Sequence, residues 1–299
     1  MSDAAQRAAD HLCIVLVEPQ HPGNVGAAAR AMKNMGLRHL VIVAPSPSFD
    51  MERARWMAPG AGDVLDQMRI TSTLAEALEG IHRVYATTAR HRRHGQPVLE
   101  PPDVAQRVLD DAEDSIRSAV LFGREDCGLS ADDALRAVAL VRIPTARHAS
   151  LNLAQAVLLC AHHVFEEARR RGAVAEGRVL GGGRTPKSTH RAEKKARSAL
   201  PVDVNAIEPA LVELVAVLNR VGFGRGTSPE KVGATLREGF QRAGLSPRQL
   251  GAIRGMVARV NFALDNPQVD WTMSRRQRAK VDALADEERP PSTNEDGHA

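Results

Sequence analysis

Residues 143–156 have the sequence IPTARHASLNLAQA, which marks the passage from a buried strand into a long helix. A proline ends the apolar run Val138–Ile143, and apolar residues recur at helical spacing from Leu151 to Arg171. We expect Ser150 to cap this helix, with Asn152 in its first turn. The exposed N–H groups of such a turn can bind an anionic or carbonyl group, although capping alone also explains both residues. The stretch is therefore a candidate binding loop.

Upstream of this loop, short apolar runs alternate with helical patterns. Each run is partly β-branched and ends at glycine, proline or polar residues, as buried strands do. This alternation predicts an α/β fold with a mostly parallel sheet flanked by helices. The expected strands are Leu12–Val17, Leu40–Ala44, Arg83–Thr88, Ala119–Phe122 and Val138–Ile143.

The rest of the chain predicts a division into four parts. Residues 1–171 would form the α/β domain, 172–203 a flexible basic linker, 204–266 a small all-α domain, and 267–299 a disordered tail. The run from Arg169 to Arg197 has ten basic residues against two acidic ones, so it either contacts phosphates or is a solvated linker. The expected helices of the small domain are 206–221, 229–244 and 247–264.

Composition limits the classes of function. The 299 residues have a formal net charge of +4 and a pI near 9.2, which suits a polyanionic partner but also fits many other proteins. The three cysteines form no Cys-x-x-Cys pair, so we expect neither a metal site nor a disulfide framework. No run approaches the ~18 apolar residues of a membrane span, and the N-terminus is polar. We expect a cytoplasmic protein with no membrane partner.

Residues 18–33, EPQHPGNVGAAARAMK, directly follow the first expected strand. A dinucleotide-binding G-x-G-x-x-G loop would need glycine in place of Val25, and no G-K-[ST] follows to make a P-loop. Asn24 can cap the helix that follows, while Gly26 and the alanines permit close packing of its backbone. Arg30, about one and a half turns into this helix, is either a solvent-facing residue or a phosphate clamp.

Residues 121–130, LFGREDCGLS, follow a later strand. Ligands of open α/β sheets bind beyond the carboxyl ends of the strands, so glycine and charge at this position indicate a site. A tight turn alone also explains the glycines. Ser130 is expected to cap the next helix, which argues against a catalytic role for it.

Taken in order, the three segments resemble the motifs of the knotted SPOUT methyltransferases, in the TrmH-type branch and, within it, the TrmJ-like tRNA ribose methyltransferases. The resemblance covers roughly residues 14–167, and its most specific part is SLNLAQA after an Ile-Pro strand end. It implies a C-terminal trefoil knot in the α/β domain that binds S-adenosylmethionine. It also implies 2′-O-methylation of a ribose, in the anticodon loop of tRNA.

The resemblance assigns site residues by matching positions. Arg30 would clamp phosphate and stabilise a developing alkoxide, because arginine, with a pKa above ~12, is a poor base; its assignment as the base is the alternative. The polar residues around it would be Asn24, Glu125, Ser150 and Asn152. The cofactor pocket would use Thr87, Thr88, Ala89, Gly123, Ile143, Ala149, Ser150 and Leu151.

The resemblance also implies partners. The family acts as a homodimer in which the motif-one arginine of one protomer completes the other's pocket, and a C-terminal helical extension helps to hold tRNA. Arg147 and His148 depart from the family's usual pair in the third motif, which leaves substrate details open. Two alternatives stand beside the tRNA enzyme: a ribosomal RNA ribose methyltransferase, and a noncatalytic RNA-binding protein of the same fold.

Overall fold

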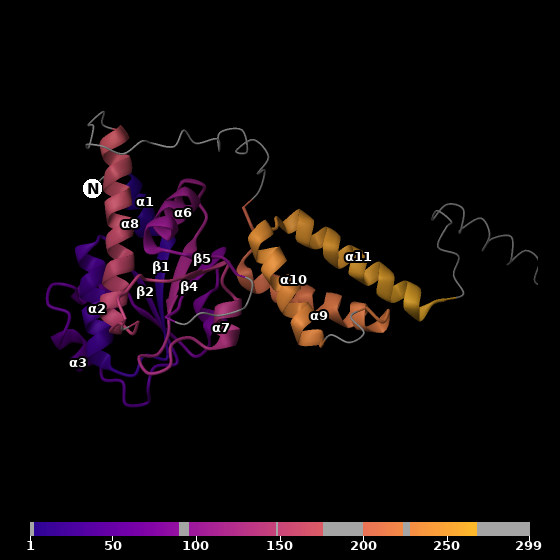
Figure 1. The fold of residues 1–299 in the computed structure, drawn as a ribbon, viewed down its shortest axis with the longest axis horizontal. Helices are drawn as coiled ribbons and strands as arrows, with labels where there is room; N and C mark the ends of the chain where they lie inside the picture. The colour runs from indigo at the N-terminus through magenta and orange to yellow at the C-terminus, as the bar shows by residue number, and fades with distance from the viewer. Residues whose placement is uncertain (1–2, 90–95, 148, 176–199, 224–227, 268–299) are drawn as a thin grey trace, which may run out of the picture.

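The computed structural model describes residues 3–89, 96–147, 149–175, 200–223 and 228–267. A seven-stranded sheet lies at the centre, with every strand pair parallel and the order β3-β2-β1-β6-β4-β7-β5 (Figure 1). The α/β fold with a parallel sheet flanked by helices is therefore confirmed. The strands are β1 (Leu12–Val17), β2 (His39–Val43), β3 (Arg69–Thr71), β4 (Arg83–Thr87), β5 (Val98–Leu99), β6 (Ser118–Phe122) and β7 (Ala139–Val141).

The five expected strands are all present, with no end shifted by more than two residues. The sequence did not predict β3 and β5. These two strands are the edges of the sheet, and their residues are exposed or only partly buried. Because they are short and lack a continuous apolar run, the signal that identifies buried strands is missing there.

Both faces of the sheet are buried, and the position of a residue along its strand decides which core it joins. In β1, Ile14 and Leu16 belong to the larger core, whereas Val15 and Val17 belong to the smaller one. Every residue of β1 is buried, so the strand has no polar face. This is the physical reason for its unbroken apolar sequence.

The helices cover the two faces unequally (Figure 1). The larger core lies under α1 (Asp3–His11), α2 (Pro22–Asn34), α6 (Pro101–Glu113) and α8 (Leu153–Ala175), and α3 (Met51–Trp56) and α4 (Gly62–Asp66) pack beside α2. The smaller core is covered by the short helices α5 (Leu74–Ala77) and α7 (Ala131–Leu135) and by the start of α9 (Val204–Arg220).

Gly26 allows α2 and α3 to touch through their backbones. A Cβ atom at Gly26 would overlap the carbonyl of Ala54 in α3. The close packing expected from this glycine is therefore present, and it fixes the direction in which α2 leaves the end of β1.

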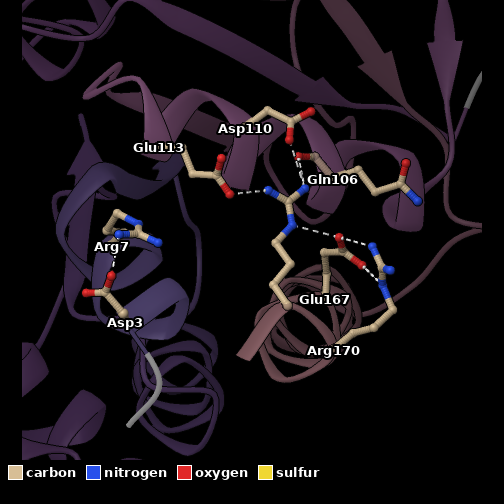
Figure 2. A network of polar contacts seen from close by, with 8 residues as sticks. Asp3, Arg7, Gln106, Asp110, Glu113, Glu167 and Arg170 are labelled. Carbon is tan, nitrogen blue, oxygen red and sulfur yellow. Dashed lines mark hydrogen bonds and ion pairs between the residues drawn. The ribbon is translucent and has the colours of Figure 1, made fainter. Parts of the chain in front are cut away.

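An ion-pair network joins α8 to α6, and Figure 2 shows its members from both helices. The guanidinium of Arg171 lies 2.8 Å from Glu167, 2.9 Å from Asp110 and 3.0 Å from Glu113. Glu167 is only 8% exposed and also pairs with Arg170. Since carboxylates of both helices share one cation, the network holds the far end of α8 on the sheet domain.

Three helices follow at the C-terminal side, α9, α10 (Pro229–Ala243) and α11 (Pro247–Asp265), each within two residues of its expected ends. Ser228 and Ser246 accept hydrogen bonds from the first turns of α10 and α11, as expected of caps before proline. The start of α9 is fixed to the sheet domain, because Val204 N donates to Ile81 O at 3.0 Å.

The expected basic linker and tail fall largely on residues 176–199 and 268–299, which lie outside the described residues, so their boundaries stay predictions. Within the described ranges, no helix combines the length and apolar character needed to span a membrane.

Candidate active site

A pocket of about 280 Å³ opens at the carboxyl edge of the sheet. Its walls come from the ends of β4, β6 and β7, the segments that follow them and the start of α8, where ligands of open α/β sheets bind. All eight residues assigned to the cofactor by resemblance line this pocket: Thr87, Thr88, Ala89, Gly123, Ile143, Ala149, Ser150 and Leu151.

A chain of side-chain hydrogen bonds connects the three sequence motifs beside the pocket. Asn24 Nδ2 donates to Glu125 Oε1 at 2.7 Å, and Asn152 Nδ2 donates to Asn24 Oδ1 at 3.0 Å. Glu125 also accepts from the backbone N–H of Gln20 at 2.9 Å and of His21 at 3.3 Å. Three of the predicted polar residues, distant in sequence, thus form one connected group.

These hydrogen bonds decide the protonation of Glu125. Partial burial raises the pKa of this carboxyl group, but the hydrogen bonds from Asn24, Gln20 and His21 outweigh it, so the pKa lies below its ordinary value. Glu125 is therefore ionised at neutral pH. It serves as a hydrogen-bond acceptor and a fixed negative charge, not as a carrier of protons.

The cap of α8 is Asn152. Its Oδ1 accepts from the backbone N–H of Ala154 at 2.9 Å and of Gln155 at 3.4 Å, and α8 begins at Leu153. The predicted cap at Ser150 is therefore wrong, as is the helix start at Leu151. Ser150 and Leu151 belong to the pocket wall instead, and asparagine caps a helix as well as serine does.

The predicted cap of α2 at Asn24 is also wrong. The helix α2 begins at Pro22, with His21 before it in extended conformation and no side-chain cap. Proline suits the first helical position because its missing N–H would have no partner there. Asn24 consequently lies within the first turn, and its amide is used for the contacts to Glu125 and Asn152.

The second motif folds into a tight turn. Gly128 N donates to Arg124 O at 2.9 Å, and Gly128 has φ +72°, a left-handed conformation that favours glycine. A Cβ atom at Gly123 would overlap the backbone of Gly128 and Leu129. The turn therefore explains both glycines, and it also forms one wall of the pocket. Ser130 caps α7, as predicted.

Arg124 is a pocket residue that was not predicted from the sequence. Its guanidinium contacts Asp126 at 2.8 and 3.0 Å and Glu18 at 3.2 Å, and these hydrogen bonds raise the pKa of Arg124. Arg124 holds the pKa of Asp126 well below its ordinary value. The available signal was the charged Gly-Arg-Glu-Asp sequence at a strand end.

Arg30 is not brought to the pocket of its own chain. It lies on the exposed side of α2, six residues beyond Asn24, which is about 9 Å along the helix. It does not line the pocket. Arg147 is exposed, and His148 lies outside the described residues.

Two of the three cysteines are core residues, and the third, Cys127, is exposed and lines the pocket. No three His, Cys, Asp or Glu side chains in the described part of the chain are placed to hold a metal ion. Burial raises the pKa of Cys13 and of Cys160 to about 12, so both are neutral core residues.

Comparisons with known proteins give consistent matches. The model of the SpoU rRNA Methylase family matches residues 11–162. The tRNA (cytidine/uridine/adenosine-2′-O-)-methyltransferase TrmJ of Pseudomonas aeruginosa (strain UCBPP-PA14) is 35% identical over 252 residues, covering 83% of this chain and 93% of that protein. The tRNA (cytidine/uridine-2′-O-)-methyltransferase TrmJ of Yersinia enterocolitica is 35% identical over 256 residues, covering 85% and 93%. The crystal structure of TrmJ from Z. mobilis ZM4 has a TM-score of 0.66 at 30% identity, covering 83% of this chain and 98% of that one.

The assignment of the α8 cap can be tested by two alanine variants. Asn152→Ala should lower the free energy of unfolding by about 1–2 kcal/mol, because α8 loses its cap and Asn24 loses a donor. Ser150→Ala should change it by less than about 0.5 kcal/mol. Urea unfolding measures both, and a larger loss for Ser150→Ala would show that the cap has been misassigned.

Proposed function

The chain belongs to the SpoU rRNA Methylase family, and we propose that it transfers a methyl group from S-adenosylmethionine to the 2′-oxygen of a ribose in tRNA. This is the family and the enzyme class that the three motifs predict. The observation that carries the proposal is the meeting of those motifs at one pocket through Asn24, Glu125 and Asn152. The anticodon loop is the proposed target, as the resemblance implies.

The pocket residues fit this cofactor. Ile143, Leu151 and Leu153 supply apolar walls for a nucleoside, and the small residues Ala89 and Gly123 complete the lining. The pocket volume of about 280 Å³ is just below the range of about 300–1,000 Å³ that is usual for small-molecule sites. The ionised Glu125 at the wall suits a ligand with a cationic centre.

When bound, S-adenosylmethionine supplies a methyl group on a positively charged sulfur. The reaction joins the ribose oxygen to the methyl carbon, breaks the carbon–sulfur bond and releases the hydroxyl proton. Among the described lining residues, none is a histidine or lysine that would accept this proton. The contribution that we propose for the chain is orientation: Asn24, Glu125 and Asn152 fix the segments that hold the cofactor and the ribose in line.

Arg30 is proposed to act on the RNA in a homodimer. Arg30 is exposed on α2 and does not line the pocket of its own chain, so its side chain is available to another molecule. Next to the start of α2, Trp56 is 75% exposed and Met57 is 52% exposed, an apolar surface suited to a second copy. A sedimentation mass of one chain at micromolar concentration would remove the dimer from this proposal.

We further propose the trefoil knot and the division into domains that the resemblance implies. The three C-terminal helices have a small core of their own, formed by Ala210, Leu245 and Leu250, which supports a separate RNA-binding unit at 204–266. The reaction would take place in the cytoplasm, where the substrate tRNA is found.

The proposed reaction is tested with the full chain, labelled S-adenosylmethionine, and purified tRNA or ribosomal RNA. We expect label in tRNA and its recovery as a 2′-O-methylated nucleoside after digestion. Label in ribosomal RNA alone would favour the alternative substrate. Cofactor binding without label in either RNA would favour a noncatalytic RNA-binding protein.

The role of Arg30 is tested by comparing two cations of α2. Arg30→Ala should lower kcat by about 100-fold or more at saturating tRNA, because the developing charge on the ribose oxygen loses a fixed cation. The affinity for the cofactor should stay within about threefold, since Arg30 does not line the pocket of its own chain and its proposed contact across the dimer is with the RNA. Lys33→Ala, which removes an exposed cation paired with Asp63, is the matched control and should keep normal turnover. A near-normal kcat in Arg30→Ala would exclude both proposed roles of Arg30, as a phosphate clamp and as the general base.

A further inference from the structure

The proposed cofactor pocket carries more negative than positive charge. Of the described residues that line it, Arg124, Glu125 and Asp126 are charged. Arg124 is shared between Asp126 and the nearby Glu18. These four side chains comprise one cation and three carboxylates, so the group as a whole is anionic at neutral pH.

Glu125 is the member of this group whose charge is least compensated. Its hydrogen bonds come from an amide side chain and from two backbone N–H groups, all of them neutral donors. No described cation lies within ion-pair distance of it, whereas Asp126 is paired with Arg124. Glu125 is also half-buried, and Asp126 is exposed, so water screens Glu125 less.

An uncompensated carboxylate at the wall distinguishes ligands by charge. S-adenosylmethionine carries a positive sulfonium, and its product S-adenosylhomocysteine has a neutral thioether at the same place; the two are otherwise alike except for the methyl group. We propose that Glu125 makes the pocket prefer the sulfonium cation over the neutral product. The methyl transfer then removes the charge that Glu125 attracts, and the product is released more easily. This inference rests on the proposed function.

The proposal differs from a purely structural role for Glu125. If the carboxylate only held the loops, its loss would weaken the binding of every ligand of the pocket by a similar factor. If its charge acts on the ligand, the loss falls on cationic ligands alone. Sinefungin separates the two, because it carries an ammonium group in place of the methylsulfonium and cannot donate a methyl group.

The experiment is calorimetric titration of the full chain with S-adenosylmethionine, sinefungin and S-adenosylhomocysteine. In Glu125→Gln, the affinity for each cationic ligand relative to S-adenosylhomocysteine should fall by about three- to tenfold. Glu79→Gln is the control, because it removes an exposed carboxylate just before β4, at the edge of the sheet opposite the pocket. The affinities for S-adenosylmethionine and for sinefungin, each relative to that for S-adenosylhomocysteine, should stay unchanged in this variant. Asp126→Asn, which keeps Glu125 intact, should lower the ratios less, by about twofold, because this carboxylate is exposed.

The outcomes separate this inference from the proposed function. Unchanged ratios in Glu125→Gln, with all three ligands weakened equally, would overturn the inference while leaving the methyltransferase assignment in place. If Glu125→Gln loses the pocket altogether, equal affinities of the unmodified chain for S-adenosylmethionine and S-adenosylhomocysteine overturn it instead. Failure of the unmodified chain to bind any of the three ligands would overturn the proposed function itself.

Discussion

The site depends on the hydrogen bonds from Asn152 to Asn24 and from Asn24 to Glu125. Each of these residues belongs to the segment that follows a different strand, with Asn24 in the first turn of α2, so the chain of contacts joins three segments that the sheet alone would leave independent. Asn152 also caps α8. The same side chain therefore decides where the longest helix of the sheet domain begins and where the first motif lies against the pocket.

This arrangement has a chemical consequence. The hydrogen bonds that position Glu125 also keep it ionised, because each of them is made to the charged form of the carboxyl group. The site thus combines fixed geometry with a fixed charge. Such a site suits a reaction in which a cationic donor must be aligned with a hydroxyl group.

Much of the fold could be predicted because β1 and its neighbours are buried on both faces and leave unbroken apolar runs in the sequence. The edge strands β3 and β5 bury little and left no such signal. The lining of the pocket could be predicted only from the family resemblance, since a tight turn accounts for Gly123 and a helix start accounts for Leu151 when each is taken alone. The cap of α8 was missed because Ser150 and Asn152 are equally good caps, and only the path of the loop selects between them.

Whether Asn24 acts on the site through Glu125 is tested by a double-mutant cycle on cofactor binding. The dissociation constant for S-adenosylmethionine is measured for Asn24→Ala, Glu125→Gln and the double variant. We expect Asn24→Ala to weaken binding in the unmodified chain and to have little further effect once Glu125 is replaced. Losses that simply add would contradict this coupling, because the two residues would then act independently.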